Sequence, residues 1–152
     1  MTAPTARTVV VAIDGSDHAA RAAAAAVELF GDRATYVLVR AVDVIPAVSP
    51  TGRLAAGSLE ALRDQERATA TAELDAVAAT LPVPVTAVVA DGSPAAAIVQ
   101  TAIERDATVI VVGSRGLGAV KRALLGSVST AVLRDADRPV LVVPAGGGPT
   151  EG

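Results

Sequence analysis

The chain has 152 residues, which is long enough for one domain with a substantial hydrophobic core. It is 51% apolar, but it contains 1% aromatic residues and no cysteine, which argues against base-stacking nucleic-acid surfaces and excludes disulfides and thiolate metal sites. Its formal net charge of −3 gives no general affinity for polyanions, so we expect no nucleic-acid partner.

Five short aliphatic runs predict β-strands at 8–14, 34–44, 83–90, 107–113 and 138–144. The runs are continuous and rich in β-branched residues, and they do not alternate between polar and apolar positions. Such runs are typical of strands that are buried on both faces of a parallel sheet.

Four longer, Ala-rich segments predict helices between these strands, at 16–31, 58–80, 93–106 and 127–137. The first has Ser16 as a good N-cap and Gly31 as a good C-terminal residue, and the third begins with the favoured pair Ser93 and Pro94. The alternating order predicts one α/β domain with right-handed crossovers.

This domain is expected to span residues 1–144, with a flexible Gly-rich tail at 145–152 and a mobile flap at 45–57. The N-terminal residues MTAPTART lack the apolar core of a signal peptide. No apolar run approaches the roughly 18 residues that a membrane helix needs. We therefore expect a cytoplasmic protein with no membrane partner.

Ligands of open parallel sheets bind beyond the carboxyl ends of the strands, where the strand order reverses. The first strand delivers Asp14 to that edge, and the fourth delivers the Gly-rich run GSRGLG, residues 113–118. Its glycines are expected to adopt positive φ and to let the backbone approach a ligand. The last helix begins at Ser127, and its N-terminus, with the hydroxyls of Ser127 and Ser129, suits a phosphate.

The charge distribution agrees with a phosphate site in this region. No carboxylate lies between Thr108 and Arg134, and the four cations there are Arg115, Lys121, Arg122 and Arg134. This +4 leaves the rest of the chain at −7, because the whole carries −3. If the first and fourth strands are adjacent, Asp14 faces the ribose of a nucleotide whose phosphates lie on the glycine run. The alternatives are a plain flexible turn with solvated cations, and an Asp14 that only caps the first helix.

Other nucleotide motifs do not fit the chain. Gly126 and Ser127 lack the lysine of a Walker A motif, and the DGSDHA run after the first strand has too few glycines for a dinucleotide fingerprint. His18, the single histidine, is predicted to be a surface or capping residue and has no partners for a metal site. We therefore assign no catalytic residue and no metal ligand.

The chain resembles a single-domain universal stress protein from VVVAIDGS at the first strand to RPVLVVP at the last. The ATP-binding pattern of that family stands complete as Gly113-SR-Gly116-LGAVKRALL-Gly126-Ser127. The resemblance implies a Rossmann-like fold of the adenine nucleotide alpha hydrolase type, with an open five-stranded parallel sheet in the order 3-2-1-4-5 and helices on both faces. It also implies that ATP binds, with or without Mg²⁺.

The site that the resemblance implies draws on three strand ends and the start of the last helix. Base and ribose contacts fall to Ala12, Ile13, Asp14, Ala41, Val112 and Gly113. Phosphate contacts fall to Arg115, Gly116, Gly126, Ser127, Val128 and Ser129, with Arg115 at a variable position. One departure is Ala12, where some ATP-binding members carry proline, and it should alter packing near adenine without removing the site.

Members similar to this chain form homodimers through the last strand. Here that strand contains Val140, Leu141, Val142 and Val143, an apolar edge that antiparallel pairing with a second copy would cover. The alternative is that the tail or a helix of the same chain covers this edge.

The expected function is ATP binding in stress response or regulation, without efficient catalysis. Three alternatives stay open from the sequence. The chain could be a slow ATPase or phosphotransferase, a member that binds cyclic AMP or AMP, or an interaction module that binds no nucleotide.

Overall fold

The computed structural model describes residues 6–43, 56–115 and 125–145. In these residues the strands are β1 (Thr8–Ala12), β2 (Thr35–Val42), β3 (Val85–Asp91), β4 (Val109–Gly113) and β5 (Val140–Val143). The helices are α1 (Asp17–Phe30), α2 (Ala56–Thr80), α3 (Pro94–Glu104) and α4 (Ser127–Asp135). The predicted alternation is confirmed. Most of the expected flap and tail, and Gly116, Gly118, Lys121 and Arg122, lie outside the described residues.

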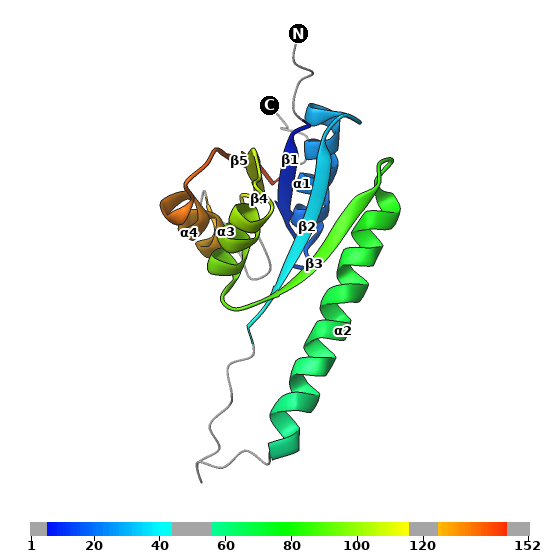
Figure 1. The fold of residues 1–152 in the computed structure, drawn as a ribbon, viewed down its shortest axis with the longest axis vertical. Coiled ribbons are helices and arrows are strands. Elements are labelled where there is room, and N and C mark those ends of the chain that lie inside the picture. Colours follow the sequence, from blue (N-terminus) through cyan, green and yellow to red (C-terminus); the bar gives the residue numbers. More distant parts are fainter. Residues whose placement is uncertain (1–5, 44–55, 116–124, 146–152) are drawn as a thin grey trace, which may run out of the picture.

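The strands form one parallel sheet in the order β3-β2-β1-β4-β5 (Figure 1). This confirms the expected order, 3-2-1-4-5. The chain moves outward on one side from β1 to β3 and then crosses back to β4. The order therefore reverses between β1 and β4, and the carboxyl ends of these two strands define the edge where an open parallel sheet offers a ligand site.

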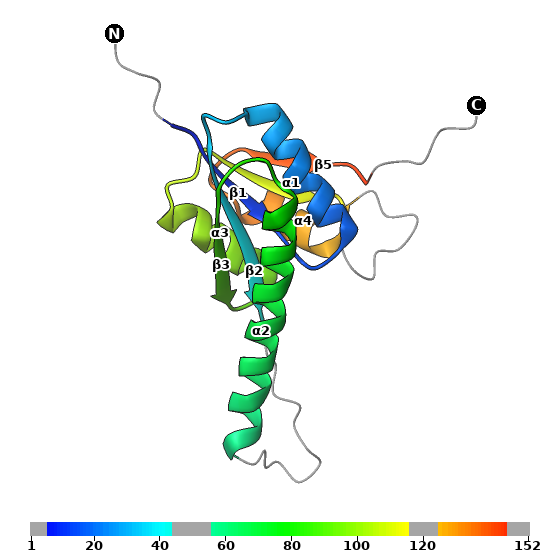
Figure 2. The same ribbon diagram turned by 90° about the vertical axis from the view of Figure 1, so that its right-hand side faces the viewer.

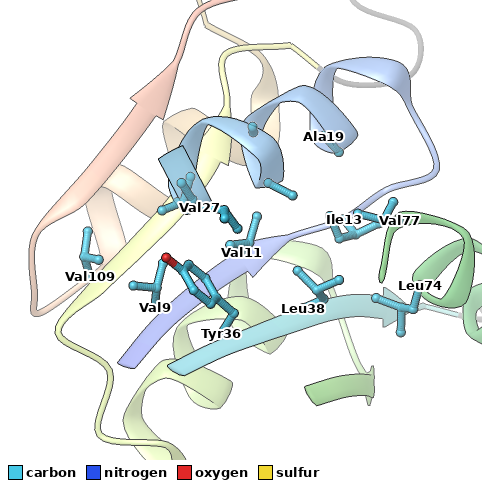
Figure 3. Packing of buried hydrophobic residues seen from close by; sticks show 14 residues of the cluster. Val9, Val11, Ile13, Ala19, Val27, Tyr36, Leu38, Leu74, Val77 and Val109 are labelled. Carbon is cyan, nitrogen blue, oxygen red and sulfur yellow. The ribbon is translucent and has the colours of Figure 1, made fainter. Parts of the chain in front are cut away.

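The helices cover both faces of the sheet, as Figures 1 and 2 show. Side chains of successive strand residues point to opposite faces. On one face Val9, Val11 and Leu38 pack with α1 and α2, and Figure 3 shows this cluster from close by. On the other face Val10 and Val39 pack with α3 and α4. The two cores hold β1 rigidly between them, so the residues that follow it start from a fixed position.

The expectation that all strands are buried on both faces is wrong for the two edges of the sheet. The strands β1, β2 and β4 are almost entirely buried, as predicted. The strand β3 exposes Thr86, Ala87 and Asp91, and every residue of β5 is only half-buried. The reason is topological, because an edge strand has one neighbouring strand and the helix layers do not reach over both of its faces.

The local signals at α1 act as the sequence predicts. Ser16 is the N-cap, and its Oγ accepts a hydrogen bond from the Ala19 N–H at 3.2 Å. At the other end Gly31 has φ +73°, and its carbonyl accepts the hydroxyl of Tyr36 at 2.6 Å. No helix in the ranges described above is both long and apolar enough to cross a membrane.

Candidate functional site

The reversal point of the sheet brings together segments that are far apart in sequence. β1 and β4 are neighbours, with Val9 opposite Val109 and Val11 opposite Val111. Asp14 follows β1 and Ser114 follows β4, so both lie at the same edge. The adjacency that a shared ligand site needs is therefore present.

Asp14 is held in the turn between β1 and α1. It is half-buried, and its Oδ1 accepts hydrogen bonds from the Ser16 N–H at 2.9 Å and the Ser16 hydroxyl at 2.5 Å. Ser16 in turn caps α1 through Ala19. Asp14 therefore does not cap α1 itself, as the alternative from the sequence had it, but supports the capping residue Ser16, and the same bonds fix its carboxylate at the end of β1.

Gly113 ends β4, but its φ is not positive, contrary to the sequence prediction. Among the described glycines, positive φ occurs at Gly15, Gly31 and Gly92. A Cβ on Gly113 would lie 3.3 Å from the Arg115 carbonyl oxygen and 3.5 Å from that of His18. The first distance is tighter than a Cβ normally makes, so a side chain here would require the backbone at Arg115 to shift slightly, whereas the distance to His18 is an ordinary van der Waals contact.

Ser114 joins β5 to the start of α4, a role that the sequence did not reveal. Its N–H donates to the Val143 carbonyl at 2.9 Å, and its hydroxyl accepts from the Ala145 N–H at 2.9 Å. Its own carbonyl accepts the Gly126 N–H at 2.6 Å. The residue is 7% exposed, so these bonds are shielded from water. Nothing in the local sequence distinguishes Ser114 from an ordinary loop serine, because its partners lie more than ten positions away.

The N-terminus of α4 lies beside the end of β4. Gly126 is the N-cap with φ −75°, so it too needs no positive φ. Ser127 and Val128 are exposed in the first turn, where their backbone N–H groups have no earlier helical carbonyl to bind. Ser129 is 3% exposed, and its hydroxyl donates to the Gly126 carbonyl at 3.0 Å. The hydroxyl of Ser129 therefore supports the helix start from within.

The local positive charge is smaller than the sequence suggests. Arg134 lies in the last turn of α4, at the opposite end from Ser127, and its Nε is 2.8 Å from Asp135 Oδ1. This pairing raises the pKa of Arg134 and lowers the pKa of Asp135. Asp135 stands one residue beyond the carboxylate-free stretch and neutralises its final cation. Arg115 is half-buried after β4, and of the two cations of this set that the structure describes, it is the one near the reversal point.

The remaining predicted residues line the ends of β1, β2 and β4. Ala12 is half-buried, whereas Ile13, Ala41 and Val112 are buried. The Ile13 N–H donates to the Val39 carbonyl at 2.8 Å, and this bond continues the β1–β2 ladder one residue past Ala12. Ile13 points into the core shared with α1 and α2, as Figure 3 shows. Its side chain is therefore unavailable to a ligand, and only backbone contacts fit its predicted role.

His18 is half-buried near the start of α1, so the prediction of a surface residue holds only in part. Its Nδ1 is the one buried side-chain nitrogen or oxygen in the described ranges without a hydrogen-bond partner. The same ranges contain no group of three His, Cys, Asp or Glu side chains that could hold a metal ion.

A charged pair that sequence reasoning missed lies beside this edge. Arg40 Nε and Glu73 Oε2 are 2.6 Å apart, and Arg40 Nη1 donates to the Ala41 carbonyl at 2.6 Å. The two charged residues are 33 positions apart and come from β2 and α2. No local pattern pairs them, and only the folding of α2 back onto the sheet brings them together.

Comparison with known proteins identifies this arrangement. Residues 5–144 match the model of the universal stress protein family. A universal stress protein of Thermus aquaticus is 38% identical over 138 residues, which cover 90% of this chain and 98% of the relative. Among solved structures, a universal stress protein from Lactobacillus plantarum has a TM-score of 0.73 at 26% identity, over 90% of this chain and 97% of the other.

A second solved structure adds a ligand to the comparison. It is a universal stress protein in complex with cAMP, with a TM-score of 0.63 and 29% identity, over 90% of this chain and 96% of the other. The family match, the Thermus relative and the shared sheet order agree with the resemblance seen in the sequence. This chain belongs to the universal stress protein family.

Proposed function

We propose that this protein binds an adenine nucleotide, with ATP as its main ligand, and acts in stress response or regulation through its bound state. It would do so as a single domain over residues 1–144 in the cytoplasm. The observation that carries the proposal is the meeting of three segments at the β1–β4 reversal point. These segments are the turn with Asp14, the close backbone passage at Gly113, and the exposed N-terminus of α4 at Ser127.

Each segment suits one part of a nucleotide. A carboxylate at a strand end suits ribose hydroxyls. The free N–H groups and the dipole at the start of α4 suit phosphates, and Arg115 adds a cation on the same side. In this proposal Ser127, Val128 and Ser129 contribute backbone N–H groups, and Mg²⁺ accompanies the phosphates of ATP. Gly126 lets the phosphates approach the start of the helix, while its own N–H stays bonded to the Ser114 carbonyl. Gly116 belongs to the same predicted set but lies outside the described residues.

Cyclic AMP is the second candidate ligand, because a structural relative at 29% identity was solved in complex with cAMP. It shares the adenosine part with ATP but carries a single phosphate. A site whose affinity depends on the α4 N-terminus should therefore prefer ATP, whereas a site dominated by base and ribose contacts should bind both.

We also propose a homodimer through β5. Val140, Leu141, Val142 and Val143 are half-buried in the single chain, and β5 pairs with β4 on one side only. Pairing with a second copy would satisfy the backbone groups of the other edge. Analytical ultracentrifugation tests this directly, because a Leu141→Lys substitution should yield a monomer with an intact fold. A dimer that withstands this substitution would place the interface elsewhere.

The first test is chemical analysis of the ligand that copurifies with the protein. Denaturing the protein and separating the released nucleotides beside ATP, ADP, AMP and cyclic AMP standards identifies what it carries. ATP near one per chain supports the proposal, and ADP directs attention to slow hydrolysis. Calorimetric titration follows for protein that emerges empty. No binding of ATP or cyclic AMP in that titration refutes the proposal and favours an interaction module.

Two substitutions at Asp14 separate its structural role beside Ser16 from its ligand role. Asp14→Asn keeps an oxygen for the Ser16 hydrogen bonds but removes the charge, whereas Asp14→Ala removes both. We expect Asp14→Asn to retain most of the stability and to weaken ATP binding by about 1–2 kcal/mol, roughly 5- to 30-fold. Asp17→Ala, an exposed acid in the first turn of α1, is the matched control and should bind ATP normally. Normal binding by a folded Asp14→Asn protein would leave Asp14 with only its structural role, the support of Ser16.

A further inference from the structure

The Arg40–Glu73 pair occupies a place beside the proposed nucleotide site. Arg40 is the third-last residue of β2, and both side chains are largely buried, with 21% and 27% of their surfaces exposed. Arg40 makes two short contacts, one to Glu73 Oε2 and one to the Ala41 carbonyl, both at 2.6 Å. The guanidinium is therefore fixed between α2 and the end of its own strand.

The Ala41 carbonyl points toward the gap that β1 leaves when it ends. Successive carbonyls of a strand point to opposite sides. The Val42 carbonyl accepts from Gly92 N–H on the β3 side, and the Val39 carbonyl accepts from Ile13 N–H on the β1 side. The Ala41 carbonyl hence faces the β1 side, one rung beyond the last bond to β1. The Arg40 guanidinium binds this carbonyl where the ladder has stopped.

Glu73 connects the same pair to the turn after β1. A Cβ on Gly15 would lie 2.6 Å from Glu73 Oε1, so the carboxylate lies directly against the backbone of that turn. Gly15 is the neighbour of Asp14 in sequence. The pair therefore spans the carboxyl ends of β1 and β2 on the side of α2.

The sheet order gives the direction in which the base of a nucleotide would extend, given the proposed function on which this inference rests. Phosphates at the start of α4 lie beside β4, and ribose at Asp14 lies at β1. β2 is on the opposite side of β1 from β4. A base that extends away from the phosphates past Asp14 is therefore directed along the sheet edge toward the end of β2 and the Ala41 carbonyl. Arg40 and Glu73 lie on the α1/α2 face, so they would approach the base from the side opposite α4.

We propose that Arg40 sets the base selectivity of this site and makes it tolerant of 6-oxo purines. Adenine carries an amino donor at position 6, whereas hypoxanthine and guanine carry a carbonyl acceptor there. A bare main-chain carbonyl would favour the amino group. A guanidinium has five N–H donors and no acceptor, and it suits the O6 and N7 acceptors of a 6-oxo purine. Because Arg40 Nη1 already donates to the Ala41 carbonyl, the hydrogen bond that this carbonyl would accept from the amino group of adenine is weakened.

The experiment compares ATP with inosine triphosphate by calorimetry on the full chain. The two nucleotides differ only at the base, where inosine replaces the 6-amino group by a carbonyl and carries a hydrogen on N1. For the unchanged protein we expect dissociation constants within about threefold of each other. Arg40→Met keeps an apolar stem in the half-buried position but frees the carbonyl, and we expect it to favour ATP by about tenfold or more. Glu73→Gln weakens the contact that holds Arg40. It should change the ratio of the dissociation constants for inosine triphosphate and ATP in the same direction, but by less.

Arg67→Met is the matched control. Arg67 forms an equally short pair with Asp91, 2.6 Å between Nη1 and Oδ1, but the pair is exposed at the β3 end. This variant should keep the ratio of the unchanged protein. Thermal melting of each variant verifies the fold, and Glu73→Gln carries the test if Arg40→Met does not fold.

Two results overturn the inference while leaving nucleotide binding intact. One is an unchanged protein that already prefers ATP by more than about tenfold. The other is a folded Arg40→Met, or in its absence Glu73→Gln, whose ratio equals that of the unchanged protein. If the unchanged protein binds neither triphosphate nor cyclic AMP, the proposed function fails, and the base selectivity falls with it.

Discussion

The contact between Glu73 and Gly15 makes a quantitative prediction about stability. Gly15 has φ +82°, a conformation that costs an L-residue roughly 1–2 kcal/mol. In Gly15→Ala the new Cβ also displaces Glu73, whose Oε1 would lie 2.6 Å away, and so disrupts its bond to Arg40. A partly exposed pair of this kind contributes about 1 kcal/mol. Alanine recovers about 0.5 kcal/mol by restricting the unfolded chain. The net loss is about 2 kcal/mol.

A double-mutant cycle with Glu73→Ala separates the two terms. In that background the carboxylate is absent, so Gly15→Ala should cost only the φ strain less the entropy gain, about 1 kcal/mol. Urea unfolding followed by circular dichroism measures all four proteins. The midpoint of thermal unfolding should fall by roughly 4–8 °C for Gly15→Ala alone.

Gly57→Ala serves as the control for a plain glycine-to-alanine change. Gly57 lies in α2, and apart from the backbone of its own helix and its chain neighbours no atom lies within 4 Å of the place that the new methyl group would occupy, so the substitution should stabilise slightly. The reasoning is refuted if Gly15→Ala costs the same with and without Glu73. In that case the backbone conformation alone would require glycine, and the packing of α2 on the turn would contribute nothing.

Two further predictions concern the fold that supports the site. Burial and, to a smaller extent, Asp32 raise the pKa of Tyr36 above 10.0, so the folded state holds its proton more tightly than the unfolded state, and stability should fall as the pH rises above about 10. Tyr36→Phe should lower the free energy of unfolding near neutral pH by about 1 kcal/mol, because the hydrogen bond to the Gly31 carbonyl is lost. It should also reduce the loss of stability above about pH 10. If that loss is unchanged in the variant, other groups cause it. Ser114→Ala removes the hydroxyl that accepts the Ala145 N–H, so urea unfolding should show a loss of about 1 kcal/mol in stability. Hydrogen exchange of the Ala145 amide should become faster. An unaltered exchange rate would contradict the role of the hydroxyl.

The sequence predicted the elements well because the signals are local. Ser16, Gly31 and Pro94 mark helix ends through contacts within a few positions, and the aliphatic runs mark strands. The order of the strands is different, since no local rule distinguishes β4 beside β1 from β4 at the opposite edge. That order was predicted from the resemblance to a family. The family's known fold supplies the pairing of distant strands, which the local patterns of one sequence do not show.

The site was predicted less completely, because its details depend on contacts across the fold. Gly113 was identified, but the reason given was positive φ, whereas its φ is not positive and the tight contact of a Cβ there would be with the Arg115 carbonyl oxygen. Arg134 was counted with the phosphate site, although a helix of this length carries it to the far end. Ser114 and Arg40 were missed because their partners lie on other elements.

The length of α2 has a consequence for the order in which the molecule opens. At 25 residues the helix is roughly 37 Å long, and in Figures 1 and 2 its first half extends beyond the sheet. Residues 57–69 are exposed apart from a half-buried Leu59, and burial begins at Ala70. The outer turns therefore gain little from the core and follow helix–coil equilibrium, whereas the turns from Ala70 onward open only with the sheet. One continuous helix thus contains two cooperative units, and the boundary falls just before Glu73, the residue that contacts the turn after β1.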